Sequence, residues 1–247
     1  MSGHNKWSTI KRKKGALDAK RSKIFSRIVK EIQIAVKEGG PDENYNPRLR
    51  LAIQNGKGAN MSKDTISKAI SKADKEGSNL QEVTFEGYAP GGVAVFIECL
   101  TDNNNRSVSN IRSVFNKKGG TLGTNGSLSF LFERKGVITL KKEGLNPDDF
   151  ELEIIDAGAE DIQDEGDVYT IYTSLESFSK VRKKLEEMKL EPENASLQRI
   201  PNDLKKLPRE EAMKVIRMVE DFEDDDDVQN VYHNLELTDE IIAAMEQ

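Results

Sequence analysis

Hydrophobic residues recur every three or four positions through the first third of the chain, the spacing that places them on one face of an α-helix. This spacing predicts three short amphipathic helices that together form a small bundle. The first covers residues 18–37, the second begins near Pro47 and is broken at Gly56 and Gly58, and the third begins after Ser62. Proline suits the first turn of a helix and serine suits its N-cap. The expected core residues are Leu17, Ile24, Phe25, Ile28, Ile32, Ala35, Leu49, Ala52, Ile53, Ile66, Ala69, Ile70 and Ala73.

From Val83 onward, short runs rich in β-branched and aromatic residues alternate with stretches of helical spacing. The first group is strand, strand, helix and strand, at residues 83–88, 93–100, 105–118 and 127–132. The second group is strand, helix, strand, strand, helix and strand, at residues 136–140, 147–157, 159–162, 167–173, 175–188 and 194–199. A helix at 208–222 and a strand at 228–234 follow, and they would complete the first group.

The order of the second group is that of a ferredoxin-like domain. The sequence therefore predicts an α+β protein, with an N-terminal three-helix bundle followed by two ferredoxin-like α/β domains, the third domain inserted in the second. The expected domains are a basic arm and bundle at 1–79, a discontinuous α/β domain at 80–133 plus 204–247, and an inserted domain at 134–203. A chain of 247 residues exceeds the common domain size, which agrees with this division.

Charge divides the chain more sharply than its net value of −6 indicates. Residues 1–75 hold 18 Lys/Arg and 7 Asp/Glu, a net charge of +11, whereas the remainder holds 19 and 36, a net charge of −17. Cations concentrated at one end are typical of a module that binds a polyanion. The competing interpretation is an ordinary solvated helical surface.

Several of these cations share a helical face. Lys20, Lys23, Arg27 and Lys30 fall on a face beside the apolar stripe of the first helix, and we expect them to face away from the core. Trp7 lies among the cations ahead of the bundle, where it either stacks on an exposed base or packs on the bundle as an anchor. The predicted nucleic-acid-binding residues are Lys6, Trp7, Lys11, Arg12, Lys13, Lys14, Lys20, Arg21, Lys23, Arg27, Lys30, Arg48, Arg50, Lys68 and Lys72.

Other chemistries lack the residues they need. The glycine-rich run at 119–127 lies between a predicted helix and a strand, the reverse of a phosphate loop, so it predicts turns. His4 and His233 are the only histidines and Cys99 the only cysteine, which excludes disulfides and multi-histidine or cysteine-based zinc sites. We expect no catalytic residue, metal, cofactor or small-molecule substrate. Without a membrane-length apolar run or a secretory signal, the expected location is cytoplasmic, with no membrane partner.

The acidic run at residues 221–227 has two interpretations. It is either a solvated loop before the last strand, or a negative surface that repels phosphates and orients the molecule on nucleic acid.

Motifs throughout the chain carry a family resemblance. They include Gly-His-Asn-Lys-Trp-Ser at 3–8, Leu-Arg-Leu-Ala-Ile at 49–53, Gly-Tyr-Ala-Pro-Gly-Gly at 87–92, Leu-Thr-Asp-Asn at 100–103 and Asp-Val-Gln-Asn-Val at 227–231. With these motifs the chain resembles the YebC/PmpR family, whose mitochondrial relatives include a translational activator of cytochrome c oxidase subunit I. It departs from the family pattern at residues 55–58, at Ser62 and at Ala89. The glycines at 56 and 58 would weaken the second helix by about 1 kcal/mol each relative to alanine.

The resemblance implies three domains, no catalytic activity and a role in regulating gene expression. Many bacterial members are described as DNA-binding transcriptional regulators, whereas others resemble translation factors that act on ribosomes making proline-rich peptides. The residues leave DNA and ribosomal RNA both open as partners, because no recognition helix or base-reading cluster is evident. Weak sequence specificity is expected on either target, since diffuse Lys/Arg contacts are made to phosphates. A protein-interaction adaptor, tethered by its basic helices, is the remaining alternative.

Overall fold

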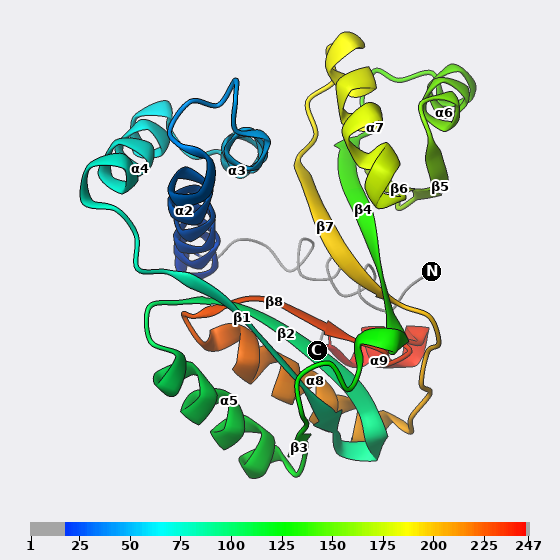
Figure 1. Cartoon of the computed structure of the whole chain (residues 1–247). Coiled ribbons are helices and arrows are strands. Elements are labelled where there is room, and N and C mark those ends of the chain that lie inside the picture. Colours follow the sequence, from blue (N-terminus) through cyan, green and yellow to red (C-terminus); the bar gives the residue numbers. More distant parts are fainter. Residues whose placement is uncertain (1–17, 246–247) are drawn as a thin grey trace. The chain divides into compact units, whose positions relative to one another are not determined.

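The computed structural model describes residues 18–245, with side chains from Arg21 onward. Three helices open the described part (Figure 1): α2 (Asp18–Gly39), α3 (Pro47–Gly58) and α4 (Lys63–Glu76). Asn46 caps α3 by accepting a hydrogen bond from the Leu49 N–H, and Ser62 caps α4 through the Thr65 N–H. The three predicted helices are therefore confirmed, including the N-cap at Ser62.

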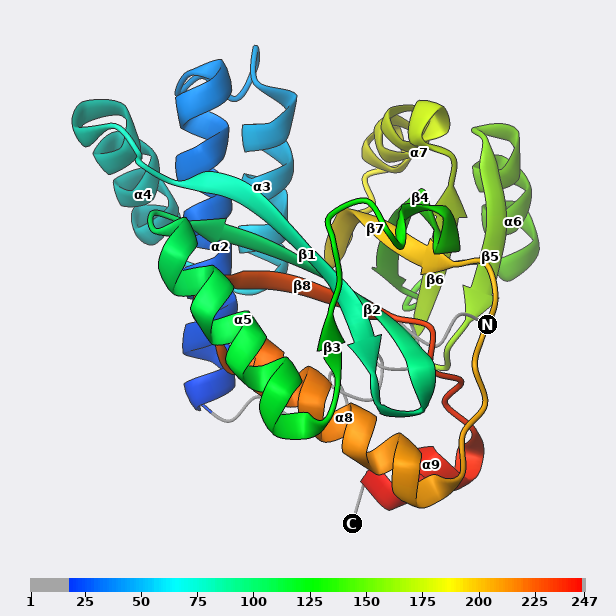
Figure 2. The ribbon, with the colours of Figure 1, turned by 60° about the horizontal axis from the view of Figure 1, so that its bottom comes forward.

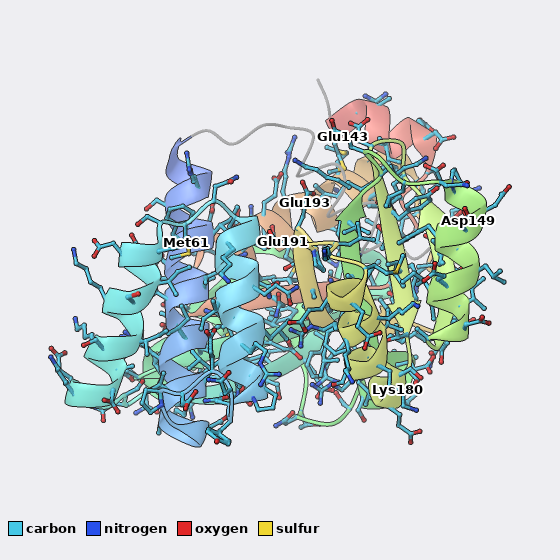
Figure 3. All side chains as sticks on the ribbon, turned by 90° about the horizontal axis from the view of Figure 1, so that it is seen from above. Met61, Glu143, Asp149, Lys180, Glu191 and Glu193 are labelled. Carbon is cyan, nitrogen blue, oxygen red and sulfur yellow. The ribbon has the colours of Figure 1, made fainter. Side chains whose placement is uncertain are left out.

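The bundle core takes residues from all three helices, and most of the predicted apolar positions that the structure describes pack there. The prediction was wrong for Ile24, whose side chain is 45% exposed. Helix α2 has 22 residues against 12 in α3 and 14 in α4, so its first turns extend past the helices that would cover them. The prediction also missed Val36 and Met61, which are buried in this core; Met61 is labelled in Figure 3. Leu17 lies outside the described residues.

The predicted break was wrong at Gly56, because α3 continues through it, whereas α3 does end at Gly58. A Cβ at Gly56 would lie 3.2 Å from the Ile66 side chain of α4, and one at Gly58 would lie 2.0 Å from the Glu193 carbonyl oxygen. The two glycines therefore allow close packing around α3, which offsets their low helix propensity.

The described chain divides into two compact units. The first holds residues 18–23, 79–133 and 200–245, and the second holds 24–78 and 134–199. The division into three domains with boundaries near 79, 133 and 203 stays a prediction.

The sheet of the first unit is antiparallel and runs in the order β3-β1-β2-β8. Its strands are β1 (Gln81–Ala89), β2 (Val93–Thr101), β3 (Thr121–Leu122) and β8 (Val228–His233), with a short 3₁₀ turn, η1 (Pro90–Gly92), between β1 and β2. Helices α5 (Asn104–Lys118) and α8 (Arg209–Asp224) lie side by side on one face of it (Figure 2). Their packing includes the rings of Phe115 and Phe222, whose centroids are 4.8 Å apart.

The central strand β2 is buried on both faces. Val93, Val95, Ile97 and Cys99 point into the core under α5 and α8, and Phe96 packs on the opposite face with Leu128, Phe132 and Tyr232. Cys99 is thus a buried core residue, as its surroundings in the sequence indicated.

The sheet of the second unit runs in the order β5-β6-β4-β7. Its elements are β4 (Phe132–Lys141), α6 (Pro147–Asp156), β5 (Ala159–Asp164), β6 (Val168–Thr173), α7 (Leu175–Glu187) and β7 (Asn194–Pro201). In chain order these make the predicted ferredoxin-like unit, and it is inserted between β3 and α8 of the first unit.

Both sheets share one spatial plan. In the second sheet the second, third, first and fourth strands of the motif lie side by side. The first sheet has the same order if its motif is taken as β2, α5, β3, β1, α8 and β8. Strand β1 therefore fills the third position although it comes first in the chain, so the first unit is a permuted version of the second. The predicted α+β fold with an inserted domain is confirmed.

Two details of the prediction fail. The expected strand at 127–132 is a bend followed by a 3₁₀ turn, η2 (Ser129–Leu131), and the strand after α5 is the short β3. The buried Glu86 carboxylate accepts hydrogen bonds from the Gly126 and Leu128 N–H groups, which leaves them unavailable for a sheet. The final helix α9 (Asp239–Met245), which packs Ile241 into the core of the first unit, was not predicted.

Among the described residues, no helix is long and apolar enough to cross a membrane.

Candidate nucleic-acid interface

The backbone of α2 places Lys20, Lys23, Arg27 and Lys30 within an arc of about 80° on one side of the helix. The described side chains of this row are less exposed than predicted: Lys23, Arg27 and Lys30 are all partly buried. Lys23 also forms an ion pair of 2.9 Å with Asp224. Arg21, one residue beyond Lys20, is exposed. That the row faces away from the core stays a prediction, although part of the Lys23, Arg27 and Lys30 side chains is covered.

The two arginines of α3 have different roles. Arg48 reaches back to α2, with its guanidinium 2.8 Å from Glu38 and 3.2 Å from Glu31. Arg50 is exposed and donates to the backbone carbonyls of Glu43 and Asn44. Arg48 therefore ties α3 to α2, whereas the Arg50 guanidinium lies at the surface of the bundle.

Two predicted lysines of α4 are exposed. Lys68 and Lys72 pair within the helix with Asp64 at 2.7 Å and with Glu76 at 3.8 Å. Their side chains are nevertheless 76% and 64% exposed. Exposed pairs of this kind contribute only about 0.3–0.5 kcal/mol, so a phosphate can displace the carboxylate. Lys75 is exposed on the same face, one turn beyond Lys72.

Arg182 of α7 is a cation near Arg50 that sequence reasoning missed, since 132 residues separate the two in the chain. Burial, followed by the charge of Arg50, lowers the pKa of the Arg182 guanidinium. Its Nη2 donates to Gln54 of α3 at 2.7 Å. An anion beside these two arginines would relieve their mutual repulsion. No signal in the sequence connects the two positions.

Six predicted residues lie outside the described part of the chain: Lys6, Trp7, Lys11, Arg12, Lys13 and Lys14. Their role, including the two interpretations of Trp7, stays a prediction.

Much of the acidic run at 221–227 is used in packing. Asp227 is buried, and its carboxylate accepts hydrogen bonds from Arg106, Thr101 and Ser107. Hydrogen bonds from Arg106 to Asp227 and to Asp102 raise the pKa of that guanidinium. The interpretation as a wholly solvated loop was therefore wrong for Asp227.

Two other aspartates of the acidic run also make contacts with α5. Asp225 accepts from Asn110 of α5 at 2.7 Å, and Asp221 pairs with Lys118 at 2.8 Å. These contacts hold the end of α8 against α5.

Two backbone N–H groups at the end of the glycine-rich run are already hydrogen-bonded to a carboxylate, so they cannot bind a phosphate. The Gly126 and Leu128 N–H groups already point at the Glu86 carboxylate, whose charge would repel an anion. Gly119 takes a left-handed conformation, with φ of 76°, and ends α5. The run is turn structure around a buried carboxylate, as the missing motif context indicated.

Comparison with known proteins agrees with the fold and with the motifs. The family model described as the TACO1/YebC protein N-terminal domain matches residues 5–76, and the model of the TACO1/YebC second and third domain matches residues 80–235. The chain belongs to the TACO1/YebC family. The resemblance found in the sequence motifs is thereby confirmed.

Relatives within the TACO1/YebC family match over nearly their whole length. A protein of Desulforapulum autotrophicum is 44% identical over 99% of this chain and 100% of its own, and one of Amoebophilus asiaticus is 49% identical over 95% and 98%. Both are named "Probable transcriptional regulatory protein". A crystal structure of a conserved hypothetical protein from Aquifex aeolicus matches with a TM-score of 0.83 and 42% identity, covering 91% of this chain and 93% of that one.

Proposed function

We propose that this protein is a non-enzymatic, cytoplasmic regulator of gene expression that binds nucleic acid through its basic N-terminal arm and helical bundle. The observation that carries the proposal is the exposed row Lys68, Lys72 and Lys75 on one face of α4. Residues 18–78 hold 13 Lys/Arg and 8 Asp/Glu, so the bundle is positive even without the arm. The regulatory names of the relatives support the same function.

The chemistry of the bundle suits phosphates better than base edges. Lysine ammonium groups are point charges that neutralise the backbone without reading sequence. Binding should therefore depend strongly on salt and weakly on sequence. A regulator of transcription would meet promoter DNA, and a regulator of translation would meet ribosomal RNA. Crosslinking in cells, followed by identification of the attached nucleic acid, distinguishes these two targets.

Our test replaces Lys68, Lys72 and Lys75 by glutamine in the full chain, since glutamine keeps helix propensity. Each cation that no longer neutralises a phosphate should reduce the salt slope by about 0.7–0.9, so the log–log slope should fall by roughly 2–3. The measurement is a salt series against a DNA duplex and a structured RNA of equal phosphate number.

The matched control replaces Lys180, Lys183 and Lys189 by glutamine. These are three exposed lysines of the inserted domain, on and just after α7, and Lys180 is labelled in Figure 3. They remove the same charge from outside the bundle and should leave the slope unchanged. Equal reductions of the slope in the two variants would mean that only net charge matters, and the proposal would fail.

A further inference from the structure

A second group of cations lies at the start of α8, inside the part of the chain that is acidic on average. Lys205, Lys206, Arg209, Lys214 and Arg217 are all exposed. Within residues 18–245, none of these five side chains has an ion-pair partner. We call these five residues the α8 patch.

Helix stability does not explain these cations. The helix dipole favours negative charge at the start of a helix and positive charge at its end, by about 0.3–1 kcal/mol for each charge. Helices α2, α3, α4, α5 and α7 each have a lysine in the last turn, as the rule favours, although α3, α4 and α5 also have a cation in the first turn. Helix α8 carries Arg209 in its first turn and has no basic residue in its last, although Glu210 and Glu211 near its start obey the rule.

The acidic end of α8 has a structural explanation, because Asp221 pairs with Lys118 and Asp225 accepts from Asn110. The basic end has no contacts of that kind. Charges that oppose the helix dipole, with no contact to compensate for them, are expected at functional surfaces.

The scaffold holds the patch in place. The opposite side of α8 is anchored in the core through Ala212, Val215 and Ile216, each almost fully buried. The backbone of Lys205 is fixed by two hydrogen bonds, one to the Asn234 carbonyl at 2.6 Å and one from the Glu236 N–H at 2.9 Å. The cations therefore stand on rigid elements.

The spacing of the cations fits a phosphate backbone. Arg209 and Arg217 are two helical turns apart, about 12 Å along the helix axis. With one phosphate per 3.4 Å along a strand, that distance covers about three to four phosphates. Arg209, Lys214 and Arg217 line a shallow surface depression together with Glu210 and Met213. Protein interfaces are enriched in aromatic residues and depleted in lysine, which makes a protein partner the poorer fit for a surface with three lysines.

We propose that the α8 patch is a second phosphate-binding surface of this protein, which contacts the same nucleic acid as the bundle. This rests on the proposed function, because it assumes that the chain binds nucleic acid. Two linked surfaces that are each weak alone bind more tightly together, since the second contact becomes intramolecular.

The test replaces Arg209 and Lys214 by glutamine in the full chain. The matched control replaces Arg112 and Lys117, an exposed arginine and lysine of α5 in the same unit. Removing two cations from the phosphates should lower the salt slope by about 1.4–1.8 and weaken binding about tenfold at physiological salt, uniformly across sequences. The control should match wild type. If the binding curves of the two variants were indistinguishable across the salt series, the α8 patch would not be a phosphate-binding surface.

The outcomes separate this inference from the proposed function. If wild type binds, if the Lys68, Lys72 and Lys75 variant has a reduced slope, and if the α8 variant does not, only the patch is wrong. If wild type shows no binding, the proposed function fails as well. A photocrosslinking residue in place of Met213 gives an independent measurement in cells. Attachment to nucleic acid supports the patch, whereas attachment to protein alone overturns it.

Discussion

Replacing Asp227 by asparagine tests whether the acidic run acts through structure or through charge. The Asp227 side chain is 5% exposed, and its Oδ2 accepts from the Ser107 hydroxyl at 2.9 Å and from the Thr101 hydroxyl at 3.1 Å. Thr101 and Ser107 are themselves buried. An asparagine keeps one acceptor oxygen but turns an NH₂ group toward these donors, so one or two charge-assisted hydrogen bonds disappear without solvent to replace them.

Hydrogen bonds to a charged group contribute about 1.5–3 kcal/mol each, so the variant should lose roughly 2–4 kcal/mol of stability. For a chain of this size each kcal/mol moves the unfolding midpoint by about 2–4 °C. The expected fall in the midpoint is therefore roughly 5–15 °C.

The assay is thermal unfolding followed by circular dichroism, with Asp226→Asn as the control. Asp226 is the preceding residue of the same run and is exposed, so its substitution removes the same charge at a position where water can replace any contact that is lost. We expect its midpoint to stay close to that of wild type. If the two variants unfold at the same temperature, the buried network does not carry the stability assigned to it.

If the run also orients the molecule by repulsion, Asp226→Asn should raise non-specific RNA binding, most clearly at low salt where the Debye length is about 30 Å.

Two further substitutions test contacts that join distant parts of the chain. Gly58→Ala should lower the unfolding midpoint, because the new Cβ would lie 2.0 Å from the Glu193 carbonyl oxygen. This loss should exceed the gain of about 1 kcal/mol that alanine gives a helix over glycine. Lys57→Ala in the same turn is the control, and a rise in the Gly58→Ala midpoint would contradict the contact. Glu86→Gln should also lower the unfolding midpoint, because an NH₂ group would replace one of the oxygens that receive the Gly126 and Leu128 N–H groups. Glu220→Gln, at an exposed position of α8 in the same unit, should have little effect, and equal midpoints for these two variants would count against the role of Glu86.

Elements with a strong local pattern could be predicted from the sequence. The helices and the inserted ferredoxin-like unit follow from hydrophobic spacing and turn residues close together in the chain. The segment at 127–132 could not be predicted in this way, because its alternating Leu128, Phe130 and Phe132 resemble a strand. What decides its structure is the Glu86 carboxylate, about 40 residues earlier in the chain. Phe130 is accordingly 70% exposed.

The same limit applies to the candidate interface. Arg48 and Arg50 are equivalent in the sequence, two residues apart at the start of one helix. Only the packing of α3 against α2 brings Glu31 and Glu38 to Arg48, while Arg50 stays exposed. A sequence shows where cations occur, but it does not show which of them are already paired.

Net charge summed over a long stretch of the chain is also the wrong scale for locating a binding surface. At physiological ionic strength, exposed charges interact over a Debye length of about 8 Å. Asp221 is twelve residues from Arg209 on α8, about 18 Å along the axis, so it is screened from that end of the patch, although Arg217 lies only four residues, about 6 Å, from Asp221. The α8 patch has five cations, and only two acidic residues, Glu210 and Glu211, lie between them in the chain. The patch is therefore locally positive, although residues 76–247 have a net charge of −17. At 0.01 M salt the Debye length exceeds the length of the helix, and the acidic end should then weaken the patch. The binding that depends on Arg209 and Lys214 should therefore fall less steeply with salt than the binding of an isolated basic surface would, because at low salt the acidic end offsets part of it.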